Sequence, residues 1–425
     1  MTVAVFTLSL LGAMALGMPI AFALLVCGIA LMLTQGQMDA TILSQKLLEG
    51  ADSFPLLAIP FFMLTGELMN SGGISKRIVN FALAWVGHIR GGLGLVAVFA
   101  SVLMAAISGS AAADAAAIGT LLIPMMRQAG YNVPRSAGLI AAGGVIAPVI
   151  PPSIGLIMFG VIANVSIGKL FLAGVFPGLL MGVSLAIAWQ WVVRRDKVSV
   201  LPRQSWSARL KAGVDGVWAL VMPFGIVIVL KFGIFTPTEA GVAACVYAFV
   251  VGSFIYRELS IRQVYTLLVS AAKSTAIVVF LIAAAMVSAW LITTSDVPEQ
   301  ISAMLQPFMG NKIVLMFVIM VLVVIVGTAL DFAPTVMILT PVLMPVVKQA
   351  GIDPVYFGVL FIMNNAIGLI TPPVGIVLNV ICGVAKISMS ELIKGLWPFL
   401  WAELIVLLLL VLFPALVMVP LKWLS

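Results

Sequence analysis

Charged residues are scarce in this sequence: Asp, Glu, Lys and Arg make up only 9% of its 425 residues, whereas hydrophobic residues make up 63%. A soluble globular domain carries about 25% charged residues. The shortage excludes an ordinary soluble protein and predicts a membrane protein that crosses the bilayer several times. The formal net charge of +7 then reflects basic loops on the cytoplasmic side of the membrane and not nucleic-acid binding.

The residues from which enzymes build common active sites are nearly missing as well. The chain has one histidine, His88, and three cysteines in apolar runs without metal-binding spacing: Cys27, Cys245 and Cys382. It contains no H-E-x-x-H, no G-x-S-x-G and no phosphate loop ending in G-K-S or G-K-T. We therefore expect neither enzyme activity nor ATP-driven transport by this chain alone. No basic residue precedes or interrupts the first apolar run, so no cleavable signal peptide is predicted.

Two proline pairs interrupt apolar segments and lie 221 residues apart: Pro151-Pro152 and Pro372-Pro373. Proline lacks a backbone donor and clashes with the preceding helical turn, so a helix unwinds there. Unwound backbone at membrane depth occurs only where it is buried in protein or lines a polar cavity. Two such breaks in corresponding halves of a chain indicate the binding site of a secondary transporter.

The two halves of the chain repeat the same order of motifs. We predict an all-α polytopic membrane protein of two inverted-topology repeats, with a first repeat over residues 1–193, a cytoplasmic linker over 194–211 and a second repeat over 212–425. Further matches at the 221-residue offset include Pro124 with Pro345, Gly174 with Gly395, and Pro177 with Pro398.

Each repeat is predicted to contain a re-entrant hairpin and a broken helix. The hairpins cover 92–128 and 312–349, and the broken helices cover 134–163 and 355–385. The hairpin arms are at or below the ~20 residues that a full crossing needs. The other predicted helices cover 2–17, 19–34, 42–70, 74–89 and 169–193 in the first repeat, and 213–231, 237–256, 262–292, 297–309 and 391–420 in the second. One kinked helix would also fit residues 2–34.

The basic residues predict an orientation in the membrane. Five spans per repeat is an odd number, so the second repeat is inverted relative to the first. When the 194–211 linker is placed in the cytoplasm, most of the 22 Lys and Arg residues lie on the cytoplasmic side, as the positive-inside rule requires. Both chain ends are then expected on the periplasmic side.

The predicted hairpin tips carry oxygen ligands. The first tip reads S-G-S-A-A-A-D over residues 108–114, and the second reads G-T-A-L-D over residues 327–331. Hydroxyls, freed carbonyls and a carboxylate suit a hard cation such as Na⁺. We expect each tip to face the break of its own half, which gives two cation sites with substrate between them. The alternative is that these small residues only allow helices to approach closely.

Two carboxylates are expected within the membrane, and such residues are functional candidates by default. Asp331 lies within the second tip. Asp114 lies one turn into a helix and could instead cap its start. Glu67 and Glu403 are expected at the membrane interface or between helices, and His88 is expected at the membrane edge.

At these motifs the sequence resembles the large membrane subunit of the tripartite ATP-independent periplasmic (TRAP) transporters, the DctM-like family. The resemblance covers essentially the whole chain. Small departures occur. Gly155 stands where the family often has Pro. In the second tip, Asp331 is followed by Phe332-Ala333, where the family is usually closer to Met-Asp-Pro. The motifs are PFFMLTGELMNSGGISKRI (60–78), GHIRGGLG (87–94), ISGSAAADAAAIG (107–119), IPPSIGLIMFGVIANVSIGKLFLAGVFPGLL (150–180), and LTPVLMPVVKQAGIDPVYFGV with LITPPVG in the second half.

The resemblance implies an elevator-type, Na⁺-coupled importer of organic acid anions in the bacterial inner membrane. Its implied partners are a small four-helix membrane subunit and a periplasmic substrate-binding protein. Sialic acid and C4-dicarboxylates are the substrate classes considered, with sialic acid favoured on overall similarity. By motif, one Na⁺ site involves Ser108, Ser110, Gly144, Ala147 and Val149; the second involves Gly327, Thr328, Asp331, Gly368 and Thr371; substrate meets Ser110, Asp114, Pro151, Ser153, Asp331 and Pro372.

Two other functions remain open at this point. A single-polypeptide Na⁺- or H⁺-coupled carboxylate carrier has the same plan but needs no binding protein. A non-transporting membrane scaffold would tolerate apolar replacement of the polar residues at the tips with little functional cost.

Overall fold

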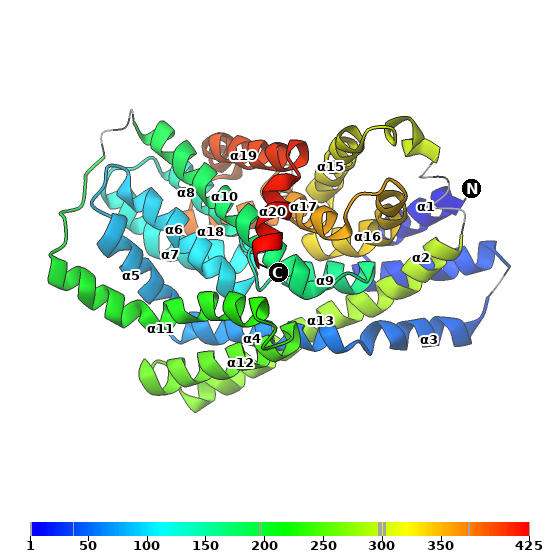
Figure 1. Cartoon of the computed structure of the whole chain (residues 1–425), viewed down its shortest axis with the longest axis horizontal. Coiled ribbons are helices and arrows are strands. Elements are labelled where there is room, and N and C mark those ends of the chain that lie inside the picture. The colour runs from blue at the N-terminus through cyan, green and yellow to red at the C-terminus, as the bar shows by residue number, and fades with distance from the viewer. Residues whose placement is uncertain are drawn as a thin grey trace.

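A computed structural model of the chain describes residues 2–36, 38–194, 196, 198–295, 300, 303–372 and 375–424. Every regular element within these residues is a helix, which confirms the predicted all-α class. Figure 1 shows α3, α4, α11, α12 and α13 along one side of the molecule, with both hairpins and both broken helices gathered above them.

The helices of the first half follow the predicted order closely. They are α1 (Thr2–Ala15), α2 (Ile20–Thr34), α3 (Ala40–Ala51), η1 (Phe54–Leu57), α4 (Ala58–Ser71), α5 (Ile74–Val86), α6 (Gly92–Ser108), α7 (Ala111–Gln128), α8 (Val133–Gly144), α9 (Ile154–Ala163) and α10 (Ile167–Val193).

The second half has the same order, with the described part of the predicted arm 297–309 reduced to helical residues 300 and 303–305 and to η3. Its elements are α11 (Trp206–Lys231), α12 (Pro237–Val250), the π-helix η2 (Val251–Ile255), α13 (Ile261–Thr294), η3 (Gln306–Phe308), α15 (Lys312–Ala329), α16 (Phe332–Gln349), α17 (Pro354–Gly368), α18 (Ile376–Ala385), α19 (Met389–Leu412) and α20 (Ala415–Leu424).

Seven helical segments of the described chain are long and apolar enough to cross a membrane. The hairpin arm α6, most of the hairpin arm α15 (Lys312–Thr328), α9 of the first broken helix and both parts of the second, α17 and α18, are apolar but shorter than these spans, whereas the hairpin arm α16 is one of the seven. These lengths are below the ~20 residues of a full crossing, but α16 is long enough to cross, so the re-entrant course of the hairpins stays a prediction. The seven are Phe54–Ser71, Ile167–Val193, Trp206–Lys231, Pro237–Ile255, Ile261–Thr294, Phe332–Gln349 and Met389–Leu412.

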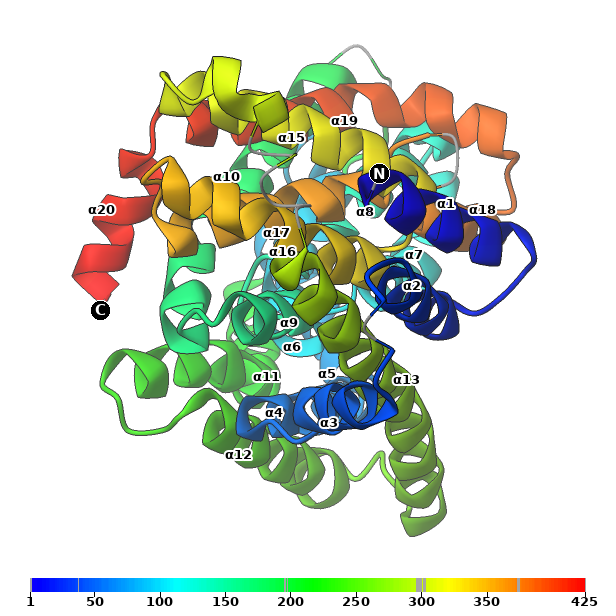
Figure 2. The same ribbon diagram turned by 90° about the vertical axis from the view of Figure 1, so that its right-hand side faces the viewer.

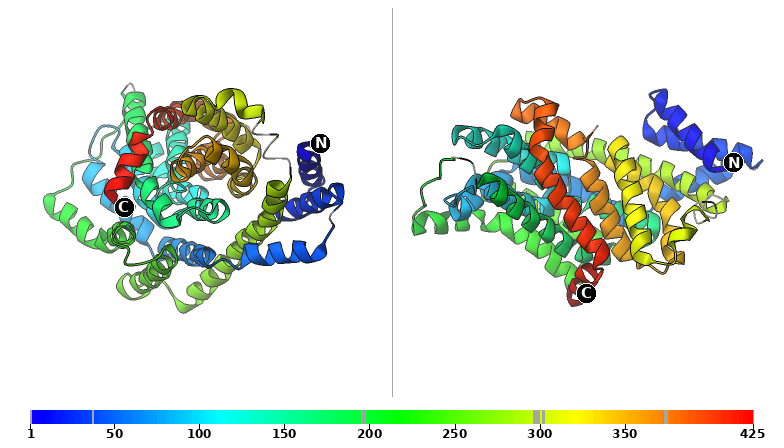
Figure 3. Two further views of the ribbon diagram at one scale, coloured as in Figure 1. Left: turned by 45° about the vertical axis from the view of Figure 1, so that its right-hand side comes forward. Right: turned by 90° about the horizontal axis from the view of Figure 1, so that it is seen from above.

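The segment 2–34 forms two helices and not one kinked helix. Gly17 has a φ of +78°, and Pro19 precedes α2, so the chain turns between α1 and α2. Figure 3 shows these two helices at the edge of the molecule. There α2 packs on α13, where Ser288 Oγ donates a hydrogen bond to Leu24 O at 2.9 Å.

Two predicted continuous helices are interrupted by proline. The helix predicted over 42–70 stops at Ala51 and restarts in η1, with Pro55 in the first turn of the new helix. The helix predicted over 391–420 stops at Leu412, because Pro414 has no N–H to donate to the Leu410 carbonyl. The hydroxyl of Tyr356 donates to that carbonyl at 2.9 Å instead. Both continuous predictions were therefore wrong.

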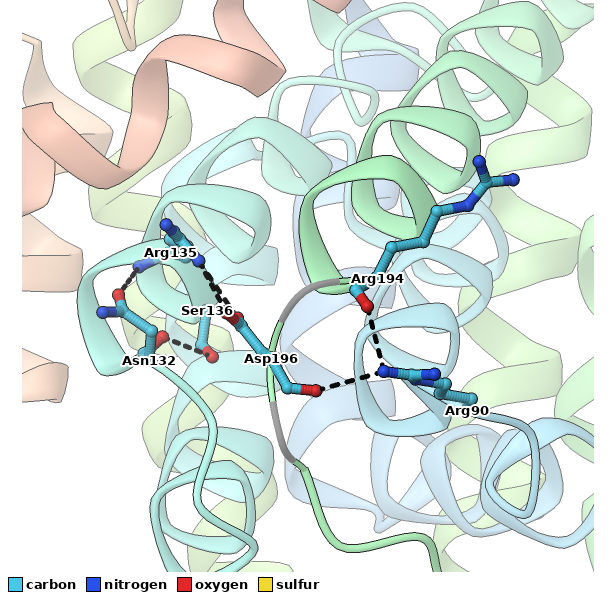
Figure 4. Close-up of polar contacts among 6 residues, drawn as sticks. All are labelled: Arg90, Asn132, Arg135, Ser136, Arg194 and Asp196. Atoms are coloured by element: carbon cyan, nitrogen blue, oxygen red, sulfur yellow. Dashed lines mark hydrogen bonds and ion pairs between the residues drawn. The ribbon is translucent and has the colours of Figure 1, made fainter.

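The segment after α10 is tied to the body of the protein. Arg135 in the first turn of α8 forms an ion pair with Asp196 at 3.0 Å, and Arg90 donates to the backbone oxygen of Arg194 at 2.9 Å (Figure 4). Helix α11 begins at Trp206, so the last residues of the predicted 194–211 linker are helical. Basic residues thus gather at this end of the molecule, at positions that the topology prediction assigned to the cytoplasm.

The hairpins and broken helices of the two halves are interleaved. The second arm of the first hairpin, α7, packs on α18 of the second broken helix, and the second arm of the second hairpin, α16, packs on α9 of the first. Figure 2 shows α9 and α16 near the middle of the molecule. Across the α7–α18 contact, Arg127 donates to the Ala385 carbonyl at 2.7 Å, at the C-terminal end of α18. A cation is favourable at a helix C-terminus.

Candidate functional site

The first hairpin reverses direction between α6 and α7 over residues 108–110. Gly109 has a φ of +60°, which glycine adopts without the steric cost of a Cβ. Ser110 caps α7, where its Oγ accepts a hydrogen bond from Ala113 N at 3.4 Å. The Oγ of Ser108 accepts a hydrogen bond from Ser110 N at 3.1 Å. Both candidate serines are thus held by the backbone of the turn itself.

Asp114 is completely buried one turn into α7. Ser108 Oγ donates to Asp114 Oδ1 at 2.5 Å, and Oδ2 has no hydrogen-bond partner in the described part of the chain. Ser110, and not Asp114, is the N-cap of the helix. A buried carboxylate oxygen without a partner is costly unless a cation or donor approaches it. This observation supports Asp114 as a member of the predicted site.

The first tip lies directly against the break between α8 and α9. A Cβ at Gly109 would lie 3.0 Å from Pro152 O, and a Cβ at Gly144 would lie 2.6 Å from Ala111 O. The backbone of each glycine can come this close to its neighbour's carbonyl only because the glycine has no Cβ. The structure thus brings together the end of α8 and the tip of the hairpin, as the sequence predicted for the first half. The break residues Ala147 and Val149 are completely buried beside them.

The end of the break starts a new helix. Ser153 is completely buried and caps α9: its Oγ accepts a hydrogen bond from Leu156 N at 3.1 Å and donates to Pro148 O. Pro151 is buried in the same turn. Ser153 therefore uses its hydroxyl to hold the break, while the N-terminus of α9 faces the hairpin tip.

The second tip differs from the first in the exposure of its carboxylate. Asp331 caps α16, where its Oδ1 accepts a hydrogen bond from Phe332 N at 2.7 Å, and the residue is exposed. Thr328 Oγ1 donates to Ile325 O at 2.7 Å, within its own helix. The carboxylate that the sequence favoured is therefore the less buried of the two.

The second tip also meets its own break, at Gly327 and Gly368. A Cβ at Gly368 would lie 3.1 Å from Gly327 O and 3.2 Å from Gly327 Cα. Next to this crossing, Thr371 N donates to Gly368 O at 3.0 Å, and Thr371 Oγ1 donates to Ile367 O at 2.9 Å. Pro372 follows and is half-buried, whereas Pro373 lies outside the described residues.

Asn365 is a candidate site residue that the sequence reasoning missed. It is 1% exposed, and its Nδ2 donates to Phe332 O at 2.8 Å. Its Oδ1 has no donor in the described part of the chain and lies 3.5 Å from the position of a Cβ on Gly327. The signal was the Asn364-Asn365 pair inside an apolar segment, since polar residues at membrane depth are functional candidates by default.

The two halves place different polar groups at equivalent positions. At the 221-residue offset, Asn365 corresponds to Gly144, and Asp114 corresponds to Thr335. The first half therefore offers a buried carboxylate where the second has a threonine, and the second offers a buried amide where the first has a glycine. Two sites built this way are similar in plan but not in ligand chemistry.

The ends of the short helices converge with a consistent polarity. The C-terminal ends of α6 and α8 meet at the first tip, and those of α15 and α17 meet at the second. The N-terminal ends of α7, α9 and α16 also come together, because Gly109 approaches the Ile154 amide and Phe332 lies on Gly155. Helix C-termini attract cations and helix N-termini attract anions. The arrangement suits two cations with an anion between them.

Three other polar features lie apart from the tips. Glu403 on α19 is completely buried, with both carboxylate oxygens unpaired in the described part of the chain, so it lies between helices as predicted and not at an interface. His88 follows α5, and its Nδ1 accepts a hydrogen bond from Arg209 at 3.3 Å. A polar cavity of about 800 Å³ is lined by Arg77, Tyr256 and Glu258 among others, and contains none of the predicted site residues.

An all-helical, multi-pass membrane protein in which two hairpin tips meet two broken helices has the architecture of a secondary transporter. Its residues 7–416 match the family model described as "Tripartite ATP-independent periplasmic transporter, DctM component". The chain therefore belongs to the family of TRAP transporter large permeases, which confirms the resemblance seen in the sequence. The family consists of transporter subunits, so the chain is not an enzyme.

Named relatives and a solved structure agree with this assignment. The chain is 52% identical over 428 residues to the 2,3-diketo-L-gulonate TRAP transporter large permease protein YiaN of Escherichia coli (strain K12), with 100% of both chains covered. It is 38% identical over 404 residues to the sialic acid TRAP transporter large permease protein SiaM of Vibrio cholerae serotype O1, with 95% of each chain covered. The YdaH transporter of Alcanivorax borkumensis has a similar fold, with a TM-score of 0.66 at 16% identity over 89% of this chain and 90% of that chain.

Proposed function

We propose that this chain is the large membrane subunit of a Na⁺-coupled importer of an organic acid anion, working by an elevator mechanism. One observation carries the proposal: each hairpin tip lies against the unwound segment of its own half, and the helix ends at these contacts have the polarity that two cations and one anion require.

The first Na⁺ is expected between the α6–α7 tip and the end of α8. Ser108 and Ser110, with backbone oxygens of Gly144, Ala147 and Val149, form the predicted ligand set. The unpaired Oδ2 of Asp114 provides negative charge beside it. Hard oxygen donors of this kind suit Na⁺.

The second Na⁺ is expected at the crossing of Gly327 and Gly368, with Thr328, Asp331 and Thr371 as predicted ligands. To this set we add the free amide oxygen of Asn365, because it is buried at the crossing and lacks a donor in the described part of the chain. Each Na⁺ that moves inward contributes about 2.3 kcal/mol per 100 mV of membrane potential.

The substrate anion is expected where the N-termini of α7, α9 and α16 converge. The classes considered from the sequence were sialic acid and C4-dicarboxylates, and the name of YiaN supports neither. YiaN, a relative that shares 52% identity over the whole chain, is named for a diketogulonate, a sugar-derived keto acid. We therefore place a sugar-derived acid first and keep the other two as competitors.

The proposed partners are a small membrane subunit and a periplasmic substrate-binding protein, and the proposed location is the bacterial inner membrane with both termini periplasmic. The test is uptake of radiolabelled 2,3-diketo-L-gulonate, sialic acid and succinate into proteoliposomes, with both partners present or absent. We expect uptake only with both partners and an inward Na⁺ gradient. Uptake by the chain alone would favour a single-polypeptide carrier, and uptake driven only by a proton gradient would remove the two Na⁺ sites from the mechanism.

A further inference from the structure

Phe332 is a point of contact between the two halves of the candidate site. A Cβ at Gly155 would lie 2.5 Å from Phe332 Cζ and 2.7 Å from Cε1. The ring of the second hairpin therefore rests on the bare backbone of α9, in the first turn after the first break. Any side chain at position 155 would force the ring to move.

The backbone of Phe332 is fixed from two directions. Its N–H donates to Asp331 Oδ1 at 2.7 Å, and its carbonyl accepts a hydrogen bond from Asn365 Nδ2 at 2.8 Å. Asn365 is buried on α17, so the second broken helix holds the residue whose ring contacts the first. With both backbone polar groups of Phe332 hydrogen-bonded and its ring packed on Gly155, the residue has a defined position, as a specificity determinant requires.

The position of the ring relates it to the predicted substrate residues. Gly155 is two residues after Ser153, and Phe332 directly follows Asp331. Phe332 is only partly buried, so part of the ring remains available for contact. It offers no hydrogen bond, and it lies among three helix N-termini that favour an anion.

We infer that Phe332, seated on Gly155, is the residue that limits the size of the organic acid accepted between the two halves. The ring forms an apolar wall against the carbon skeleton of the substrate, while the helix N-termini hold its carboxylate. Sites of this kind combine apolar walls with a few placed polar groups. The inference rests on the proposed function, since it assumes that the substrate binds between the tips.

A double-mutant cycle in the complete transporter tests the inference. Phe332→Ala, Gly155→Ala and the double variant are reconstituted with the small subunit and the binding protein. The kcat/KM for sialic acid is divided by that for the smaller 2,3-diketo-L-gulonate. We expect Phe332→Ala to raise this ratio roughly tenfold, the scale on which apolar pockets discriminate substrate size. Gly155→Ala should change the ratio when Phe332 is present and leave it unchanged in the Phe332→Ala background.

Matched controls separate this effect from a general loss of packing. Phe317→Ala removes a 50% exposed ring from the other arm of the same hairpin, and Gly225→Ala adds a Cβ with nothing within 4 Å. Phe332→Leu keeps an apolar side chain of similar reach, so it guards against a variant that fails to fold. We expect it to give a ratio between those of the wild type and Phe332→Ala.

Three results would contradict the inference. In one, the ratio for Phe332→Ala equals that for Phe317→Ala; in another, Gly155→Ala acts equally in both backgrounds. In the third, the wild-type transporter is active and every variant has the same substrate ratio as the wild type. Failure of the proposed function is recognised separately. In that case the wild-type complex would transport none of the acids. The Tm values of the Phe332 and Gly155 variants would still report the contact between the ring and the glycine.

Discussion

Gly327 and Gly368 cross with their backbones in contact: a Cβ on Gly368 would lie 3.1 Å from the Gly327 carbonyl oxygen and 3.2 Å from its Cα. The two residues come from the ends of different helices, α15 and α17, and are separated by 41 positions in the sequence. The crossing places the C-terminal dipoles of two helices at one point, where a cation is stabilised.

Gly368→Ala is expected to weaken Na⁺ coupling more than it weakens the fold. The added Cβ must displace the Gly327 backbone by a few tenths of an ångström, and overpacking of this kind costs about 1–3 kcal/mol. We expect the Na⁺ concentration for half-maximal uptake to rise about tenfold, which corresponds to ~1.4 kcal/mol. Gly383→Ala is the control, because nothing lies within 4 Å of its Cβ. An unchanged Na⁺ dependence in Gly368→Ala would place the second ion elsewhere.

Asp114→Asn tests the role of the negative charge of this residue, because it removes the charge and keeps the shape of the side chain. The amide can keep the contact with Ser108 Oγ but removes the negative charge, so the first Na⁺ loses its closest buried anionic group. A ligand that binds only the folded state stabilises it by RT ln(1 + [L]/Kd), so a weaker site gives a smaller increase in Tm at the same ligand concentration. We therefore expect Asp114→Asn to lose part of the Na⁺-dependent increase in Tm, with K⁺ as the control ion. A full Na⁺-dependent increase in the variant would assign Asp114 a structural role only.

Asn365→Leu is expected to affect both the second ion and the position of Phe332. The variant removes the free Oδ1 at the Gly327–Gly368 crossing and the hydrogen bond to Phe332 O. Leaving a buried carbonyl without its donor costs about 1–3 kcal/mol. We expect a lower Na⁺ affinity together with an altered substrate ratio, whereas Gly368→Ala should lower the affinity alone. Asn364→Leu is the comparison, because its Nδ2 donates to Met320 O, away from Phe332.

The order of the elements could be predicted from the sequence because local rules dominate there. Proline pairs, glycine turns and apolar runs predicted both hairpins and both broken helices to within a few residues, as Ser108, Ser110 and Pro354 show at their helix ends. Where prediction failed, a single proline was discounted: Pro55 starts a new helix after the break that follows Ala51, and Pro414 prevents α19 from continuing beyond Leu412.

The site could be predicted only in part because its contacts cross between distant segments. The sequence marked Gly155 and Phe332 as separate departures from the family pattern, but nothing in it shows that the ring lies on that glycine. Similarly, Asn365 was overlooked because its role depends on the approach of Gly327, which is a tertiary contact. Periodicity identifies which residues face the core, whereas pairwise contacts between distant segments require the fold.

The last prediction concerns His88, the single histidine, which the sequence analysis placed at the membrane edge. Its Nδ1 accepts a hydrogen bond from Arg209, and Arg209 is 5% exposed. Partial desolvation, followed by the positive charges of Arg209 and Arg203, lowers the pKa of His88 from its ordinary value near 6.5. A neutral ring accepts from Arg209, whereas a protonated ring cannot.

Because this pKa is lower in the folded state, the unfolded chain binds a proton first as the pH falls below about 6.5. The contribution of His88 to stability is therefore present above that pH and declines as the pH falls toward the folded pKa. We expect Tm to drop between pH 7 and pH 5.5 more steeply in the wild type than in His88→Gln, whose amide oxygen accepts from Arg209 at every pH. A proton-relay role for His88 predicts a different result, in which His88→Gln abolishes uptake at pH 7 while leaving Tm unchanged.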